Sequence, residues 1–471
     1  MLIPPPGNQL QVASTGLDRL ERAITGEICV GPQAYDNLKY LCDDIGSRWG
    51  GSENEKKAAE FLALKMREYG LQRVRLEEFD CLCWERNGFG RLEVLEPLHR
   101  ELGILPLPYT IAGTTEGELV IIHEGTPEEF QRRADEIRQK IVLASPTSPT
   151  GAQVTRRIHR PEKHARSEKA GALAFLWMNL VPGQLHLTGS ICFGRESHIP
   201  AASVSLETGS YLARLAAKGP VRLRITTCGK VRPGKSWNVV GEICGKDSGG
   251  PTVLAGAHYD SHDVGCGAMD NGSGTVCILE AARALAMHAD EIPGSLKFVC
   301  FSQEETGLFG SEAYAAAHAE EMKDLRFMFN VDGVGFDAGS KSFALQAQSG
   351  LVGFFKCLLQ EIGLKTVVDN GISPYWDHFP FFRAGVPCGS LSNMDVRETL
   401  GRYCHSSADT LDKISEPDLR LTSAAVARAL LAIVRAGEGD WKETRRSAEE
   451  IVKALEDDNW MESLEFAGHR L

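Results

Sequence analysis

The stretch that decides the fold reads Thr252-Val-Leu-Ala-Gly-Ala-His258-Tyr-Asp260, an apolar run that ends in polar residues. A short continuous apolar run is typical of a strand that is buried on both faces of a sheet. Similar runs lie on either side of it, at residues 238–243, 296–302, 325–331 and 343–347. Helical spacing of apolar residues fills the intervals, at 274–288, 310–323, 351–362 and finally 423–436. This alternation predicts an α/β fold in which helices cover both faces of a mixed, mostly parallel sheet.

The residues before this region differ in texture. Residues 34–90 combine helix patterns with one strand, and Ser52 followed by Glu55 is a plausible capping box for a helix that stops at Gly70. From about 95 to 230, short strand patterns alternate with Gly and Pro, which indicates a separate β-rich module.

Inside that module we expect strands at 117–122 and 140–144, an exposed loop at 147–169, and at 169–179 a helix end running into a second helix. The resulting division is 1–95 as the N-terminal part of the α/β domain, 96–231 as an inserted domain, 232–439 as the main α/β core and 440–471 as a charged helical tail.

Composition excludes several classes of function. The chain has 471 residues and a net charge of −12, which argues against a protein that neutralises nucleic-acid phosphates. No apolar run approaches the about 18 residues that a membrane helix needs. The thirteen cysteines form no C-x-x-C pair, and the N-terminus lacks the pattern of a secretory signal, so we expect a reducing, cytoplasmic location. Neither nucleic acid nor membrane is an expected partner, and homo-oligomerisation stays open.

Familiar catalytic motifs are absent or broken. His123-Glu124 begins like a zincin motif, but Pro127 occupies the place of the second histidine. Gly265-Cys-Gly267 follows a strand like a dinucleotide-binding loop, but Asp270 replaces the third glycine and would repel a pyrophosphate. The sequence contains no G-x-S-x-G elbow, which argues against the commonest serine hydrolases.

Ligand-type side chains cluster instead at the ends of the predicted strands. Functional groups in open α/β sheets collect at the carboxyl ends of the strands. Each of these side chains alone has an ordinary structural interpretation, but their joint placement predicts one site. The set comprises His258, Asp260, Asp270, Glu304, Glu305, Asp332 and His405.

Imidazoles and carboxylates without a thiolate suit zinc or a similar divalent ion. These side chains fall at five places along the chain, with His258 and Asp260 together at one and Glu304 and Glu305 together at another. Five ligand groups exceed the three that one catalytic zinc uses, which favours two ions about 3.5–4 Å apart with a bridging carboxylate. In the adjacent pair Glu304-Glu305, one carboxylate can bind metal while the other faces the bound water as a general base.

The sequence resembles the co-catalytic zinc aminopeptidases, in the clan that also holds glutamate carboxypeptidase, the transferrin receptor and glutaminyl cyclase. The matching motifs, in order, are Ala257-His-Tyr-Asp-Ser261, Met269-Asp-Asn-Gly-Ser-Gly274, Phe301-Ser-Gln-Glu-Glu-Thr-Gly-Leu-Phe-Gly-Ser311, Asn330-Val-Asp332 and His405. The Glu-Glu-x-Gly-Leu-x-Gly-Ser block is the most specific. The middle module resembles a protease-associated domain, through residues 140–144, 169–179 and 199–203. The resemblance covers about residues 34–437 and implies a zinc-exopeptidase (phosphorylase/hydrolase-like) fold.

The resemblance also implies a mechanism, hydrolysis of an amide bond in small peptides or amino-acid derivatives by a metal-bridging hydroxide. The implied roles are Asp270 as bridging ligand, His258 and Asp332 on one zinc, Glu305 and His405 on the other, Glu304 as general base and proton donor, and Asp260 as acceptor of the second imidazole proton of His258.

Contacts to the substrate are weaker inferences. Trp376 stands where the resembling family often has serine. It has two interpretations: simple packing, or a bulky wall that narrows the substrate pocket. His378 likewise has two interpretations: a hydrogen bond within the core, or a contact to the oxyanion of the reaction. Arg402 and Tyr403 can meet a substrate oxygen or carboxylate, or Arg402 can pair with an acid such as Asp409.

Three alternatives to an aminopeptidase-like enzyme stay open. They are an N-acyl amino-acid amidase or carboxypeptidase, a one-zinc acyltransferase like glutaminyl cyclase, and a non-catalytic, receptor-like binding protein. A receptor-like relative should have lost ligands, whereas all five ligands and the base are present here, so we expect an enzyme. The sequence leaves the native metal and the preferred side chain undecided.

Overall fold

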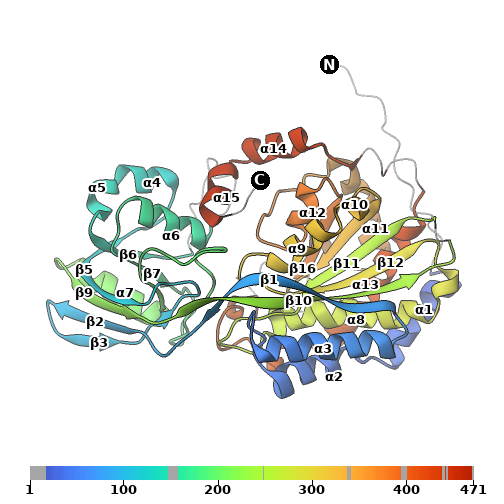
Figure 1. Cartoon of the computed structure of the whole chain (residues 1–471), viewed down its shortest axis with the longest axis horizontal. Coiled ribbons are helices and arrows are strands. Elements are labelled where there is room, and N and C mark those ends of the chain that lie inside the picture. The colour runs from blue at the N-terminus through green and yellow to red at the C-terminus, as the bar shows by residue number, and fades with distance from the viewer. Residues whose placement is uncertain are drawn as a thin grey trace.

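The computed structural model describes residues 17–146, 158–247, 249–336, 341–393, 400–437, 441 and 444–468. They form two lobes, a large α/β lobe and a smaller one built around a second sheet, joined by a long two-stranded ribbon (Figure 1). Among the described residues, no helix combines the length and hydropathy needed to cross a bilayer.

The sheet of the large lobe has the order β1-β10-β12-β11-β13-β16-β14-β15. Its strands are β1 (Gln72–Glu85), β10 (Lys230–Cys244), β11 (Thr252–His258), β12 (Ser295–Phe301), β13 (Leu325–Val331), β14 (Lys341–Leu345), β15 (Thr366–Asp369) and β16 (Cys388–Asn393). The four central strands β12, β11, β13 and β16 are parallel, whereas β10 and β14 join them antiparallel. The mixed, mostly parallel sheet predicted from the alternating pattern is confirmed.

Helices cover both faces of this sheet, as the continuous apolar strands require. One face carries α1 (Arg19–Val30), α2 (Ala34–Lys39), α3 (Glu53–Glu68), α8 (Ser273–Ala286), α11 (Val352–Ile362) and α13 (Glu416–Arg435). The other carries α9 (Phe309–Ala317), α10 (Ala319–Met322), α12 (Phe379–Arg383) and α14 (Ala448–Asp457). Ser52 caps α3 by accepting a hydrogen bond from the Glu55 amide.

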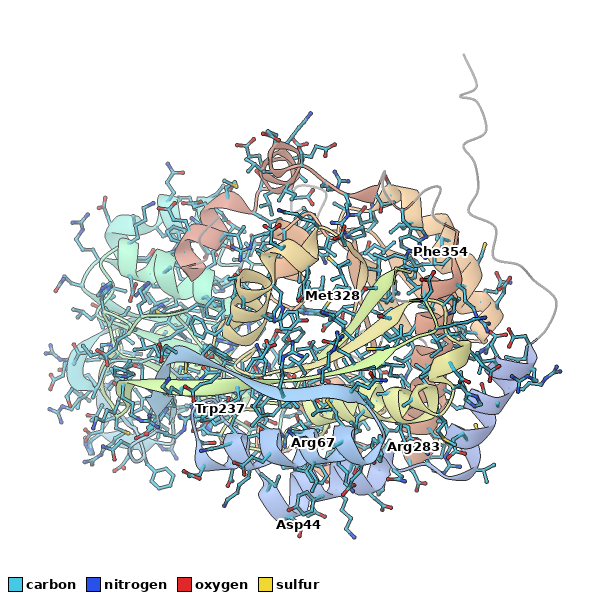
Figure 2. All side chains as sticks on the ribbon, turned by 45° about the vertical axis from the view of Figure 1, so that its right-hand side comes forward. Asp44, Arg67, Trp237, Arg283, Met328 and Phe354 are labelled. Carbon is cyan, nitrogen blue, oxygen red and sulfur yellow. The ribbon has the colours of Figure 1, made fainter. Side chains whose placement is uncertain are left out.

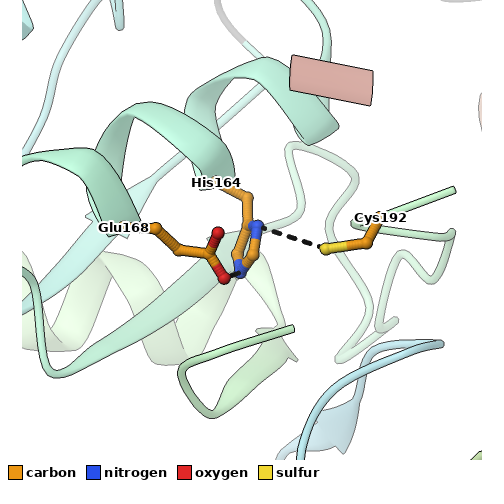
Figure 3. Close-up of side chains that lie close together, drawn as sticks. All are labelled: His164, Glu168 and Cys192. Carbon is orange, nitrogen blue, oxygen red and sulfur yellow. Dashed lines mark hydrogen bonds and ion pairs between the residues drawn. The ribbon is translucent and has the colours of Figure 1, made fainter. Parts of the chain in front are cut away.

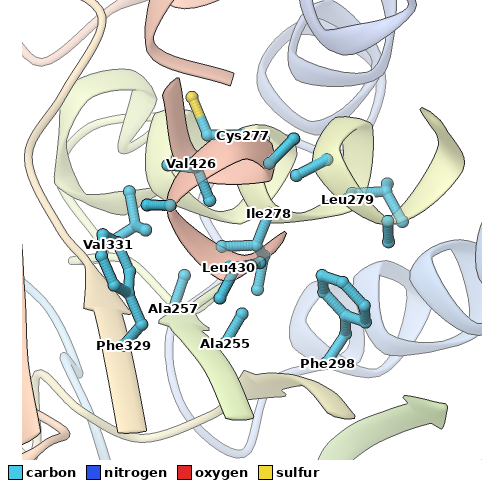
Figure 4. Close-up of a cluster of buried hydrophobic side chains, with 14 of the residues drawn as sticks. Ala255, Ala257, Cys277, Ile278, Leu279, Phe298, Phe329, Val331, Val426 and Leu430 are labelled. Atoms are coloured by element: carbon cyan, nitrogen blue, oxygen red, sulfur yellow. The ribbon is translucent and has the colours of Figure 1, made fainter. Parts of the chain in front are cut away.

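The core of the large lobe lies between the central strands and helices α8 and α13. Ile278 of α8 and Leu430 of α13 pack on Ala255, Phe298 and neighbouring strand residues, all shielded from water (Figure 4). Each large apolar side chain buried in this way contributes about 1.5–3 kcal/mol. Figure 2 shows Met328 of β13 in the interior, whereas Asp44 and Arg67 lie on the outer surface.

The smaller lobe is built on a sheet of order β3-β2-β9-β5-β6-β7-β8-β4. Its elements are β2 (Arg91–Glu96), β3 (Arg100–Leu102), β4 (Leu105–Pro106), β5 (Gly113–Ile121), α4 (Pro127–Arg132), α5 (Ala134–Ile137), β6 (Lys140–Ala144), α6 (Arg160–Lys169), β7 (Ala174–Met178), β8 (Ala201–Val204), α7 (Leu206–Ala216) and β9 (Arg222–Thr227). Because β2 pairs with β9, this sheet begins at Arg91, slightly before the boundary expected at residue 96.

Two expectations for this lobe were wrong. Residues 160–169 are the largely buried helix α6 and not an exposed loop; residues 147–157 lie outside the described part. Residues 174–178 are strand β7, between β6 and β8, and not a second helix. The many charged residues of α6 favoured an exposed segment in the sequence. The helix can nevertheless be buried because its polar side chains have partners; Lys163, for example, donates to the carbonyl oxygens of Glu124 and Ser145.

The two-stranded ribbon of β1 and β10 determines the position of the smaller lobe relative to the large sheet. Val239 pairs with Cys300 near the carboxyl end of β12, and the ribbon continues beyond that point to the pair Glu85 and Lys230. The inserted lobe is thereby carried past the carboxyl edge of the central strands (Figure 1). The tail helix α15 (Met461–Ala467) packs on α6, and Glu462 pairs with Arg166.

Candidate metal centre

The predicted ligands meet at the carboxyl edge of the parallel strands. In the sheet register His258 lies beside Phe301 of β12, and Gly256 lies beside Asn330 of β13. The next residues along β12 and β13 lead into Glu304-Glu305 and Asp332, so these side chains leave the sheet at the same edge as His258. Asp270 and His405 reach the same place from loops, although 135 positions separate them in sequence.

The interatomic distances divide the centre into two halves that share Asp270. On one side, His258 Nε2 lies 3.3 Å from Asp270 Oδ1 and 3.6 Å from Asp332 Oδ1. On the other, His405 Nε2 lies 3.1 Å from Asp270 Oδ2 and 3.3 Å from Glu305 Oε2. The two oxygens of Asp270 therefore face two different imidazoles, which is the arrangement that a bridging carboxylate requires.

Glu304 lies on the first half of the centre. Ligand-type atoms of His258, Glu304 and Asp332 all lie within 4.8 Å of one another. Its carboxylate therefore borders the same space as the two predicted ligands, as a group that moves protons there must.

Asp260 does more than the sequence suggested. Its Oδ1 lies 3.3 Å from His258 Nδ1, where it can orient the ring. Its two carboxylate oxygens also accept hydrogen bonds from the backbone amides of Glu304 (3.1 Å) and Glu305 (3.2 Å). The buried carboxylate of Asp260 thus orients His258 and also holds the backbone of Glu304 and Glu305.

Sequence reasoning missed two further groups that hold the centre. The carboxylate of Asp409 accepts from the amides of Met269 (2.8 Å) and Asp270 (3.1 Å), and so fixes the bridging residue from behind. The buried guanidinium of Arg48 donates to the carbonyl oxygens of Tyr259 and Gly267 in the loops on either side. The sequence indicates neither role, because the groups that these two side chains hold lie far away along the chain.

The electrostatics of the centre show an excess of buried acid. Burial raises the pKa of Glu304 well above its ordinary value, and it raises that of Glu305 to about 8 against the opposing effect of His405. Burial would also raise the pKa of Asp270, but hydrogen bonds from His258 and His405 hold it well below the ordinary range. Closely packed carboxylates of this kind call for cations.

The donor set fits divalent metal. Within the described part of the chain, His258 Nε2 and Glu305 Oε1 are buried without a hydrogen bond of acceptable geometry, although carboxylates lie near both halves of the centre. Such atoms are rare in folded proteins unless an ion or water binds them. Imidazole and carboxylate donors without thiolate suit zinc.

The inserted lobe contacts the backbone of both ligands on the second half of the centre. The amide of Thr188 donates to the carbonyl oxygen of His405 (2.8 Å), and Ser190 Oγ donates to that of Glu305 (2.7 Å). These bonds come from two residues that are only two positions apart. The insert is therefore part of the structure that positions the centre.

A cavity of about 460 Å³ opens onto the centre between the two lobes. Trp376 and Arg402 line it, but His378 and Tyr403 do not. His378 is buried and its Nε2 contacts Gln346, which favours its core interpretation. The walls contributed by the insert are mostly apolar, and include Trp177, Leu180, Val181, Pro182, Leu187 and Phe193.

The alternative pairing of Arg402 with Asp409 is wrong. Both oxygens of Asp409 accept backbone amides, as described above, and the carboxylate is buried. The guanidinium of Arg402 instead lies 5.2 Å from the centre of the Tyr403 ring.

Residues 238–430 match the profile of peptidase family M28. This match spans the part of the chain that carries the metal centre. Carboxypeptidase Q of Mus musculus is 27% identical over 418 residues, which cover 84% of each chain. The zinc aminopeptidase of Bacillus subtilis, a solved structure, is 27% identical with a TM-score of 0.62 over 84% of this chain and 94% of that one. A peptidase M28 precursor of Shewanella amazonensis shares the fold at 22% identity, with a TM-score of 0.74 over 91% and 98%. The chain is a metallopeptidase.

Proposed function

We propose that this metallopeptidase is a di-zinc exopeptidase of small peptides, of the aminopeptidase type, with Glu304 as its general base. The observation that carries the proposal is the Asp270 carboxylate, whose two oxygens lie 3.3 Å and 3.1 Å from the imidazoles of His258 and His405. One ion would be held by His258, Asp270 and Asp332, and the other by Asp270, Glu305 and His405. When bound, zinc supplies Lewis acidity toward a carbonyl and lowers the pKa of water.

The chain's own residues supply the remaining steps. The Glu304 carboxylate takes a proton from the attacking water and later gives it to the nitrogen of the leaving amine. Asp260 keeps Glu304 in position through its backbone amide and keeps the His258 ring oriented. The insert contributes apolar side chains to the cavity. Water that a bound substrate displaces from these walls would strengthen each electrostatic contact inside the cavity.

The cavity also supports a preference for small substrates with apolar side chains. Its volume of about 460 Å³ lies within the range of small-molecule sites. Trp177 and Phe193 of the insert face it together with Trp376 of the core. We expect apolar residues on either side of the scissile bond to raise kcat/KM relative to charged ones.

A carboxypeptidase or N-acyl amino-acid amidase is the second candidate, because Arg402 lines the cavity and a guanidinium suits a substrate carboxylate. A panel of aminoacyl amides, dipeptides and N-acyl amino acids, offered to the zinc-loaded chain, separates the two. Cleavage of amides that lack a free carboxylate supports the aminopeptidase. A strict need for that carboxylate, abolished in Arg402→Gln, would establish the second candidate instead.

Metal counting tests the di-zinc part. Reconstituted protein should contain two zinc ions per chain. One ion at most, with no hydrolysis of any panel member, would favour a reaction like that of glutaminyl cyclase.

Two further assignments are proposed with this function. The inserted lobe would be a protease-associated-like domain that acts as one wall of the substrate cavity. A reducing, cytoplasmic location is supported by all thirteen cysteines, which are unpaired. Cell fractionation with an antibody against the chain tests the location, and recovery in an extracellular fraction would reject it.

A further inference from the structure

A third histidine lies against the second half of the metal centre. His262 follows His258 by four positions, in the loop after β11, and only 4% of it is exposed. Its ring stacks on Trp49, with centroids 5.4 Å apart and planes at 22°. It also meets the ring of His405 edge-on, with centroids 4.4 Å apart. Packing against these two rings restricts the orientation of the His262 ring.

Neither nitrogen atom of His262 has a hydrogen-bond partner within the described residues, although a carboxylate oxygen is close. Nε2 lies 2.8 Å from Glu305 Oε2, but the ring does not aim an N–H at that oxygen, and neither nitrogen forms a hydrogen bond. Two donors of one ion approach each other in this way, since each lies about 2.0–2.2 Å from the metal and the two are then roughly 3 Å apart.

A third donor completes the group. Ligand atoms of His262, Glu305 and His405 all lie within 4.8 Å of one another. We propose that His262 is a further ligand of the ion held by Glu305 and His405. The proposal rests on the proposed di-zinc function, and it adds a ligand that the matching sequence motifs do not contain.

This ligand makes the two ions unequal. With His262, the second ion has four protein donors, together with Asp270, Glu305 and His405. The first has three, from His258, Asp270 and Asp332. A zinc with four protein ligands is typically a closed structural site, and one with three keeps a position open for water or substrate. The first ion, beside Glu304, would therefore be the one that exchanges its non-protein ligand, and the second would be bound more tightly.

A cobalt-loaded His262→Cys variant tests the proposal by spectroscopy. A thiolate that binds cobalt(II) gives a charge-transfer absorption in the near ultraviolet, which a thiol outside the coordination sphere does not. We expect this band in His262→Cys, and not in the wild-type chain or in His198→Cys, a control at an exposed position of the insert. Because the wild type carries the same native cysteines, their contribution is subtracted.

A second variant measures affinity and preserves the packing. His262→Phe keeps an aromatic ring against Trp49 but removes both donors. We expect the second ion to be lost to a chelator at a concentration more than about 100-fold lower than in the wild type, a larger effect than the loss of an outer hydrogen bond. Absence of the cobalt band together with unchanged zinc affinity in His262→Phe would overturn the proposal.

The outcomes separate this proposal from the function on which it rests. A wild-type chain that binds two ions and cleaves peptides, with no band in His262→Cys and unchanged zinc affinity in His262→Phe, rejects only the fourth ligand. A band in His262→Cys without peptide cleavage by the wild type supports the ligand and rejects the function.

Discussion

Two buried clusters with similar ligand-type side chains differ in whether hydrogen bonds within the protein satisfy those side chains. In the insert, His164, Glu168 and Cys192 offer ligand atoms within 4.8 Å of one another (Figure 3). In the core, His262, Glu305 and His405 do the same. In the insert cluster, however, Ser197 Oγ lies 2.9 Å from His164 Nε2, and Glu168 accepts the amide of His198 at 2.8 Å.

The difference shows that proximity of ligand types does not make a metal site. Burial raises the pKa of Cys192 to about 12 and lowers that of His164 to about 4, so both groups are neutral and no thiolate is available. The partners of this cluster satisfy it as it stands. The core cluster has unsatisfied donors and opens on a cavity, and these two features mark it as functional.

The largest expected contrast comes from removing one histidine from each cluster. In His405→Ala, zinc content should fall by one ion per chain, and kcat/KM by about 10⁴-fold or more, because several kcal/mol of metal stabilisation are lost. His164→Gln should leave zinc content and kcat/KM unchanged. Elemental analysis and peptide hydrolysis measure both. A loss of zinc in His164→Gln would place a metal in the insert and remove the contrast.

Glu304 and Glu168 provide the next contrast. Glu304→Ala should keep both zinc ions and lose about 10³-fold in kcat, because a positioned general base contributes about 10²–10⁴-fold. Glu168→Ala should lower the melting temperature through its lost hydrogen bonds and leave kcat unchanged. Turnover by zinc-loaded Glu304→Ala at the wild-type rate would contradict its role.

The catalytic half of the fold could be predicted because its signals are local. Strands β11 and β13 have the bounds that their apolar runs predicted, and their ends carry His258 and Asp332. The ligand set follows from that placement, since parallel strands end at the same edge.

The rest could not be predicted because it depends on contacts between distant residues. Helix α6 carries charged residues throughout, and only its partners in the fold explain its burial. Ser190 and Asp409 look like ordinary loop residues, and their hydrogen bonds to Glu305 and Asp270 appear only in three dimensions. His262 was overlooked because it stands next to a matching motif without belonging to it.

The pH dependence of stability should distinguish the insert cluster. The pKa of buried His164 is lowered to about 4, below the ordinary 6.5 of the unfolded chain. Between these values the unfolded chain binds a proton that the folded chain does not, so the free energy of unfolding falls as the pH falls. The loss should reach about 3 kcal/mol between about pH 7 and about pH 4. Urea unfolding of zinc-loaded His164→Gln should show a flatter dependence than the wild type, and parallel curves would refute this.

The smallest expected effect tests whether the insert acts on the centre. Ser190→Ala removes the hydrogen bond to the carbonyl oxygen of Glu305, at a cost of about 1–3 kcal/mol for a buried acceptor. Part of that cost should appear at the metal, as a decrease of about tenfold or less in zinc affinity and kcat/KM, which Ser190→Thr should restore. Ser197→Ala, which leaves His164 Nε2 without its hydroxyl, should lower stability by a similar amount and leave zinc affinity unchanged. Equal zinc affinities in both alanine variants would mean that the insert forms a wall of the cavity without positioning the ligands, because the two serines differ chiefly in which cluster they contact.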